Sequence, residues 1–292
     1  MVKRLFVLNV ALFMLCGTLL GKVPVQHKTR LNEGWTFLRQ DIGNIWEAVR
    51  PVKPGQPEEY PIWENVTLPH CFNAEDCVAP DINYYQGPGW YKTQLEISNP
   101  YKNGRVLLEF EGAGQKTDVY IYTTKVGHHV GGYDSWNVDI TEAVNKFLSS
   151  EDAARFKGKV PLSIRCDNSR DAEMIPSNLS DFNVYGGIYR YLNLVYLPAV
   201  TVDEISIKPE LNADFRKATL KVTGSFYNPS DIRSANVCVT IKSPDGKVVK
   251  SNTIANITPL GKQLLMDVEI EKPEVWDCLL YTSPSPRDRT RS

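Results

Sequence analysis

The sequence lacks an excess of charge of either sign. It carries 33 Lys and Arg residues against 34 Asp and Glu residues, so the formal net charge of the 292-residue chain is −1. Proteins that bind nucleic acid or anionic membranes through their overall electrostatic potential carry a clear basic surplus. The balance therefore gives no electrostatic reason to expect nucleic acid or a membrane surface as a partner.

Cysteine is scarce as well. Six cysteines in a chain of this length are too few for a fold held together by disulfides. Cys166 and Cys238 each lie in an alternating, strand-like run and are expected to be buried thiols. Cys71 and Cys77 lie close together in one predicted loop, where a local disulfide and two separate thiols are both open.

Long apolar runs are confined to the amino terminus. Lys3 and Arg4 precede an almost wholly apolar segment from Leu5 to Leu20. This order is typical of a signal peptide, here residues 1–21, and predicts a secreted or periplasmic protein with no membrane segment after cleavage. A membrane anchor is the alternative because the run is long. A lipoprotein signal at Cys16 is a third, although Leu15 is bulky where lipoprotein processing requires a small residue.

Helical periodicity is almost absent, and only residues 141–148 carry it, with Asp139 or Thr141 as the cap. Instead, 19 Gly and 19 Pro separate many short runs of β-type residues. We expect strands in several of these runs, namely 90–97, 106–110, 118–122, 135–140 and 160–166. Many strands with loops of uneven length predict a jelly-roll β-sandwich over residues 22–200.

The pattern changes near Val200. From Thr201 onward, apolar residues alternate cleanly at regular spacing, and Asp245-Gly246 is a hairpin signal. We expect a second, smaller sandwich of immunoglobulin type over residues 201–277. It is incomplete, because Trp276-Asp277 leads into no closing strand. Residues 278–292 resemble a translated sequencing adapter, so we expect a non-native tail there.

One stretch combines a polar loop with a hydrophobic strand. Gly186-Gly187 follows the loop and permits positive φ or the close approach of another surface. The run from Ile188 to Leu197 predicts a buried strand that Pro198 ends. Arg190 interrupts this run, so we expect a carboxylate partner for it. The candidates are Asp181, Asp167 and Asp171.

The segment from Asp181 to Arg190, D-F-x-x-Y-G-G-I-Y-R, resembles the end of the amino-terminal sugar-binding domain of glycoside hydrolase family 2, the β-galactosidase family. Eight further motifs follow the family's order at ordinary spacing, and the resemblance covers Leu31 to Trp276. These motifs begin at Leu31, Val66, Gly89, Phe110, Asp118, Gly131, Asp139 and Asp167.

The resemblance implies an amino-terminal accessory part of a secreted β-galactosidase-like enzyme that hydrolyses O-glycosyl bonds. In that family the two catalytic carboxyl groups sit on a following (β/α)₈ barrel. Alternating β and α segments are missing here. We therefore expect no catalytic residue, no cofactor and no metal site, and we expect the chain alone to be inactive. Its partners would be the carbohydrate substrate and the missing catalytic barrel.

The resemblance also assigns two substrate-binding positions, each on a loop that reaches the barrel mouth. One is Gln86, before the Gly-aromatic-Tyr motif, where the family often has Asn or Arg. The other is Asp181, whose carboxylate can accept two hydrogen bonds from vicinal sugar hydroxyls or help to ligate a cation. β-Galactosidases, β-glucuronidases and β-mannosidases share these accessory domains, so the sugar stays open.

Other chemistry-bearing residues are expected to be structural. Asn32-Glu33 is similar to the family's acid/base pair but lies beside a turn glycine. His70 is interpreted as a hydrogen-bonded structural histidine. His128 and His129 are adjacent in a strand, so they point to opposite faces and cannot share a metal. The alternative function is a free-standing carbohydrate-binding module with exposed aromatics. These would be Tyr84, Tyr85 and Tyr185.

Overall fold

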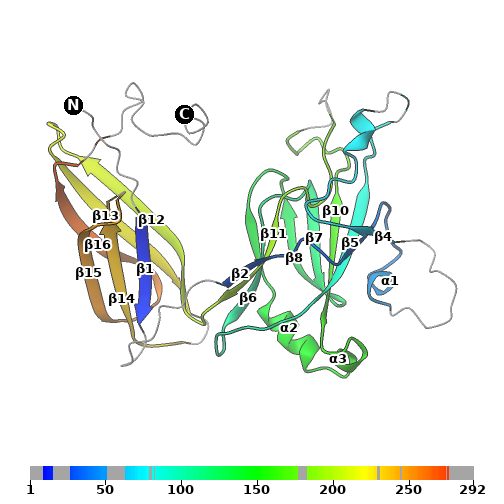
Figure 1. Ribbon diagram of the computed structural model, residues 1–292, viewed down its shortest axis with the longest axis horizontal. Coiled ribbons are helices and arrows are strands. Elements are labelled where there is room, and N and C mark those ends of the chain that lie inside the picture. Colours follow the sequence, from blue (N-terminus) through cyan, green and yellow to red (C-terminus); the bar gives the residue numbers. More distant parts are fainter. Residues whose placement is uncertain are drawn as a thin grey trace. The chain divides into compact units, whose positions relative to one another are not determined.

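The computed structural model of the chain (Figure 1) describes residues 9–15, 27–50, 63–78, 81, 83–176, 183–228, 231–243, 245–273 and 275. Its contacts divide it into two units, separated between Leu197 and Pro198. The boundary predicted from the sequence lies a few residues later, at Thr201. The first unit runs from Gln26 to Leu197, and the second contains the chain from Pro198 onward.

The first unit is a sandwich of two antiparallel sheets, as the jelly-roll prediction requires. The larger sheet contains β4 (Glu64–Val66), β3 (Trp35–Leu38), β5 (Pro88–Leu95), β10 (Val160–Asp167), β7 (Lys116–Ile121) and β8 (Thr124–Val130), in that order. The smaller sheet contains β2 (His27–Arg30), β11 (Leu192–Leu197), β6 (Arg105–Phe110) and β9 (Trp136–Asp139). All the pairs are antiparallel, which confirms the predicted all-β class.

The core of this unit lies between the two sheets. On β10, Leu162, Ile164 and Cys166 point into it, and Leu192 and Leu194 of β11 do so from the other sheet. This is the alternation that the sequence shows, because successive strand residues face opposite sides.

Four short helical segments accompany the sandwich in the described part of the chain. They are α1 (Trp46–Val49), η1 (Glu75–Cys77), α2 (Thr141–Leu148) and α3 (Asp152–Arg155). The second of the α-helices covers the residues predicted from the sequence. Its N-cap is Ile140, which forms no side-chain cap hydrogen bond, so neither Asp139 nor Thr141 is the cap. Asp139 Oδ1 accepts a hydrogen bond from the Thr141 N–H at 2.9 Å beside it.

The second unit is a smaller β-sandwich. One sheet contains β12 (Thr201–Leu211), β13 (Lys217–Tyr227) and β16 (Gly261–Glu271), and the other contains β1 (Asn9–Leu15), β14 (Ala235–Lys242) and β15 (Val248–Ile257). Val222, Val237, Val239 and Ile241 are fully buried in its core. The predicted turn is present, since Gly246 has a φ of 85° and its N–H donates to the Ser243 carbonyl at 2.8 Å.

β1 lies inside the predicted signal peptide. Its backbone pairs antiparallel with β14 from Asn9 opposite Lys242 to Leu15 opposite Asn236. The signal peptide stays a prediction, and its removal would leave this edge of β14 unpaired. Within the described part of the chain, no helix is long and apolar enough to cross a membrane. The predicted tail, 278–292, lies outside the described residues.

Candidate functional site

The loop carrying Gln86 and the segment that leads to Gly187 meet at one end of the first unit. β5 begins at Pro88, two residues after Gln86, and Pro88 lies opposite Asp167 at the end of β10. Asp167 also lies opposite Lys116, where β7 begins. Gly187 forms an isolated antiparallel bridge with Gly114, just before β7. The antiparallel topology therefore brings these loops to the same edge.

The backbone is held on both sides of Gln86, whose side chain is half-buried. On one side, the Tyr85 N–H donates to Asp76 Oδ2 at 2.7 Å, and the Tyr85 hydroxyl donates to the Pro88 carbonyl at 2.8 Å. On the other side, the Gly87 N–H donates to Asn168 Oδ1 at 2.9 Å. The position of Gln86 is therefore fixed by its neighbours.

Asn73 holds the segment that follows Asp181. Its side-chain nitrogen donates to Asn183 Oδ1 at 2.8 Å and to the Val184 carbonyl at 2.9 Å. Its side-chain oxygen accepts from the Gly186 N–H at 2.9 Å. One buried amide thus substitutes for the backbone partners that an irregular segment lacks.

Asn168 links the two segments directly. Its side-chain nitrogen donates to the Tyr85 carbonyl at 3.0 Å and to the Val184 carbonyl at 2.8 Å. Asn73, Asn168 and Asn183 are 1%, 1% and 7% exposed, so their hydrogen bonds form away from water. We call these three residues the asparagine cluster. Its hydrogen bonds join the Gln86 loop to the segment after Asp181.

Gly186 and Gly187 provide the two properties expected of them. A Cβ atom on Gly186 would lie 2.2 Å from Phe72 Cζ, so this position requires the close approach of an aromatic ring. Gly187 has a φ of 111°, and a Cβ there would lie 2.4 Å from the Tyr91 hydroxyl. Any side chain at either position would displace the rings beneath the loop.

His70 has the structural role expected of it. Its Nδ1 lies 2.9 Å from the Tyr91 hydroxyl, and its ring packs edge-on against Phe37. Burial lowers the pKa of the imidazole, against a smaller opposing effect of Glu64. The neutral form is therefore favoured.

The prediction of a buried Arg190 is wrong. Its side chain is exposed, because β11 begins only at Leu192. Asp167 pairs instead with Arg165 at 2.9 Å, and Asp171 pairs with Lys116. Within the described residues, no carboxylate forms an ion pair with Arg190. The third candidate, Asp181, lies outside the described residues.

The remaining polar residues have local partners. Glu33 is exposed and accepts a hydrogen bond from the Thr67 hydroxyl at 3.2 Å. His128 lies 2.6 Å from Asp118, whereas His129 lies 3.1 Å from Asp134, so the two imidazoles have separate carboxylates.

The cysteines follow the expectations in part. Cys71 is a thiol whose Sγ lies 3.3 Å from Asn73 Oδ1, so the local disulfide is not formed. Cys166 is fully buried, and burial raises its pKa to about 12. Cys238 was also expected to be buried but is half-exposed.

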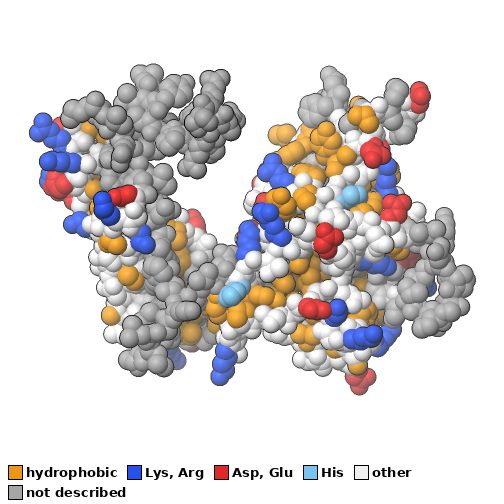
Figure 2. All heavy atoms as spheres, in the orientation of Figure 1, with side chains coloured by type: hydrophobic (Ala, Val, Ile, Leu, Met, Phe, Trp, Pro, Cys, Tyr) orange, Lys and Arg blue, Asp and Glu red, His pale blue; other side chains and the backbone are white. Residues whose placement is uncertain are grey.

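The surface of this unit is mixed in character. On the face that Figure 2 shows, positive and negative side chains are interspersed, in keeping with the net charge of −1. Tyr84 and Tyr185 are 41% and 43% exposed, whereas Tyr85 is half-buried beneath the Arg39 guanidinium, 4.6 Å from its ring centroid. Two of the three tyrosines named for a binding module are therefore at the surface.

Residues 42–198 match the family described as glycosyl hydrolases family 2, sugar binding domain. The chain belongs to this family. The matched residues include β5, β10 and β11, the Gln86 loop and the asparagine cluster.

Several family 2 proteins are similar over most of the chain. A β-glucuronidase structure from Parabacteroides merdae is 64% identical with a TM-score of 0.83, covering 86% of this chain and 32% of that protein. β-Glucuronidase 3 of Bacteroides uniformis is 51% identical with a TM-score of 0.78, covering 86% of this chain and 31% of that protein. A β-galactosidase from Thermoanaerobacter pseudethanolicus is 23% identical over 248 residues, which are 84% of this chain and 30% of that protein. This chain thus spans about a third of the length of these relatives.

Proposed function

We propose that the chain is the amino-terminal accessory part of a secreted family 2 glycosidase that hydrolyses β-glucuronides. The observation that carries this proposal is the asparagine cluster in a domain of the matched type. It joins the Gln86 loop to the segment after Asp181, and the resemblance assigns sugar contacts to Gln86 and Asp181. The identities of 64% and 51% to proteins named β-glucuronidase support a glucuronide over the galactoside expected from the motifs. A β-galactoside stays the second candidate.

In this proposal the chain binds and orients the sugar but does not cleave it. Retaining glycosidases need two carboxyl groups about 5–5.5 Å apart, one as acid/base and one as nucleophile. The expected location of that pair is a barrel after residue 277. The Asp181 carboxylate would accept hydrogen bonds from sugar hydroxyls, and Gln86 would contact the same ring from the neighbouring loop.

The complete protein tests the substrate. We expect turnover of an aryl β-glucuronide to exceed that of the matching aryl β-galactoside by a wide margin, and the 292-residue chain alone to turn over neither. Faster turnover of the β-galactoside would indicate that the complete protein is a β-galactosidase instead. Turnover by the isolated chain would contradict its accessory role.

Asp181 tests the site. In the complete enzyme, Asp181→Ala removes charge-assisted hydrogen bonds worth roughly 1.5–3 kcal/mol, so kcat/KM should fall about 10- to 150-fold. Arg190→Ala is the matched control, because this nearby charged residue is exposed. Equal losses in both variants, or none in Asp181→Ala, would remove Asp181 from the site.

The second candidate function is a free-standing carbohydrate-binding module, favoured by the exposure of Tyr84 and Tyr185. Exposed aromatic rings can stack on the faces of sugar rings. If the isolated chain binds oligosaccharides, and Tyr185→Ala abolishes that binding while Asp181→Ala does not, the module is the better description.

A further inference from the structure

Two clefts lie on the first unit on either side of a shared wall formed by Glu33, Thr93 and Gln94. The clefts lie where β3 and β5 cease to pair. β3 pairs with β5 only as far as Lys92, whereas β5 continues along β10 to Leu95. This half of β5 therefore has one uncovered edge. The part of β5 beyond Lys92 lies about 20 Å along the strand from Gln86, at ~3.3 Å per residue.

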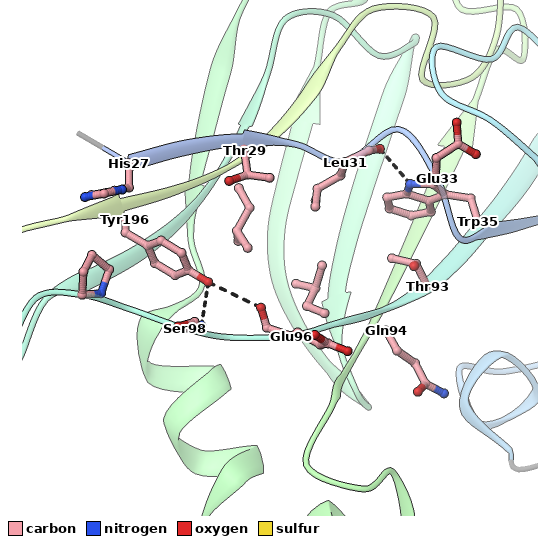
Figure 3. Close-up of a pocket in the computed structure, with 13 residues that line it drawn as sticks. His27, Thr29, Leu31, Glu33, Trp35, Thr93, Gln94, Glu96, Ser98 and Tyr196 are labelled. Carbon is pink, nitrogen blue, oxygen red and sulfur yellow. Dashed lines mark hydrogen bonds between the residues drawn. The ribbon is translucent and has the colours of Figure 1, made fainter. Parts of the chain in front are cut away.

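The first cleft, of about 610 Å³, has an apolar floor and a polar rim (Figure 3). Leu31, Trp35, Leu194 and Tyr196 are among the floor residues. The two aromatic side chains are fixed, because Trp35 Nε1 donates to the Leu31 carbonyl at 2.9 Å and the Tyr196 hydroxyl accepts from the Ser98 N–H at 2.9 Å. The rim contains hydroxyl, amide and carboxyl groups from Thr29, Glu33, Thr93, Gln94 and Glu96. An apolar floor with converging polar groups suits a sugar ring, whose C–H faces pack and whose hydroxyls reach the rim.

The second cleft, of about 590 Å³, is cationic. Its floor is the outer face of the larger sheet, where Thr36 and Ser163 both lie opposite Lys92 on neighbouring strands. Its walls come from the end of α1 and from the residues around α3. Among the described residues that line it, four side chains are cationic and one, Glu33, carries a carboxylate. The four are Arg50, Lys92, Arg155 and Lys159.

Within the described part of the chain, one buried hydroxyl in the floor of the second cleft has no hydrogen-bond partner. Ser163 is 1% exposed, and its Oγ forms no hydrogen bond within the described residues. Its neighbours Leu162 and Ile164 point into the core, so Ser163 faces the outer side of the sheet, where the cleft lies. An unsatisfied buried hydroxyl is destabilising, and a ligand oxygen that accepted its proton would remove that cost.

Arg155, Lys159 and Lys92 have partners at the surface. Arg155 pairs with Asp152 at 2.9 Å, Lys159 pairs with Glu96 at 2.6 Å, and Lys92 Nζ lies 4.0 Å from the centroid of the Trp63 ring. Exposed ion pairs of this kind contribute little and exchange readily with a competing anion.

We propose that the two clefts form one binding surface for an acidic oligosaccharide. One sugar ring occupies the first cleft, and the carboxylate or sulfate of the adjoining ring faces the cations of the second. Thr93 and Gln94 contact the linkage on the shared wall. This site goes beyond the proposed function, and it uses neither Gln86 nor Asp181.

Calorimetric titration of the 292-residue chain tests the ligand. The probes are a β-linked disaccharide of glucuronic acid, its neutral counterpart cellobiose, and sodium sulfate. We expect the diglucuronate to bind about tenfold or more tightly than either of the others, and its affinity to fall as salt is added. Equal affinity for cellobiose would exclude a role for the cations. Equal affinity for sulfate would reduce the site to an anion site without sugar recognition.

Variants locate the ligand. Ser163→Ala should weaken diglucuronate binding several-fold while leaving thermal stability unchanged or higher, a combination that a purely structural serine does not give. The double change of Arg155 and Lys159 to Ala should weaken it about tenfold. Lys146→Ala, on the exposed face of α2, is the matched control and should bind as the parent does. Loss of binding in Lys146→Ala or Asp181→Ala, with normal binding in Ser163→Ala, would overturn the proposal.

Discussion

Asn73 and Asn183 lie 110 residues apart in the sequence and exchange hydrogen bonds in the interior. Asn73 Nδ2 donates to Asn183 Oδ1 at 2.8 Å, and Asn183 Nδ2 donates to the Asn73 carbonyl at 3.1 Å. The exchange joins the loop after β4 to the segment before Gly186. Because Asn168 joins the same segment to the Gln86 loop, buried hydrogen bonds connect three irregular stretches at one end of the sandwich.

Asn73→Ala should destabilise the first unit by about 2–3 kcal/mol, because it removes the buried hydrogen bonds that Asn73 forms with Asn183 Oδ1 and with the Gly186 N–H. Urea unfolding followed by tryptophan fluorescence measures the change. Asn137→Ala, at an exposed position of β9, is the control and should stay within about 0.5 kcal/mol of the parent. Equal stability of the two variants would mean that the cluster does not hold the loops.

Gly187→Ala should destabilise the unit by more than about 3 kcal/mol. The added methyl combines an unfavourable φ of 111° with overlap of the Tyr91 hydroxyl and of the His70 carbonyl, 2.7 Å away. Gly158→Ala provides a matched control, since that glycine also has a positive φ, 76°, but a methyl group there would meet nothing within 4 Å. It should cost only about 1 kcal/mol. Similar losses at both glycines in thermal unfolding would show that φ alone matters.

The fold was predictable where burial imposes alternation. β7, β13 and β14 have one face in a core, and the alternating patterns of these strands are visible in the sequence and indicate both sandwiches. β8 was anticipated only around His128 and His129, because none of its residues is fully buried and Gly127 breaks the alternating pattern. The strand predicted after Gly187 began too early, at Ile188, whereas β11 begins at Leu192. Tyr189 and Tyr191, before β11, are only half-buried.

The candidate site was predictable only through its motifs. Gln86 and Asp181 were singled out by their positions beside family motifs, and physical pattern alone would have left both as loop residues. Asn73 and Asn183 carry no periodic signal, because amides in loops are usually exposed. Their role depends on contacts between distant segments, which a single sequence does not display. The prediction for Arg190 failed for the opposite reason, because the apolar residues around it have the pattern of a buried strand although Arg190 itself is exposed.

Cysteine reactivity should separate Cys166 from Cys238. Cys166 is inaccessible and its pKa is raised to about 12, so the reactive thiolate is absent at neutral pH. Cys238 is half-exposed, and hydrogen bonds led by that with Thr253 lower its pKa. Iodoacetamide labelling of the folded chain at pH 8, read by peptide mass spectrometry, should modify Cys238 well before Cys166. Labelling of both at one rate, matching that of the urea-unfolded chain, would contradict the burial of Cys166.

His70 should make the first unit sensitive to mild acid. Burial lowers its pKa in the folded state below the ordinary value of 6.5. Above pH 6.5 both the folded and the unfolded states hold the neutral ring, so the residue contributes no pH dependence there. As the pH falls below 6.5, the unfolded state takes up a proton that the folded state resists, and the free energy of unfolding decreases. In His70→Gln this component is absent, so the variant should lose less stability than the parent between pH 7 and pH 5.

Tyr91→Phe removes the hydroxyl that lies beside the imidazole but keeps the burial that shifts its pKa. It should therefore unfold more easily at every pH while retaining the parent's pH slope. Urea unfolding of all three proteins at half-unit pH steps decides the matter: a parent slope in His70→Gln would assign the acid sensitivity to other groups.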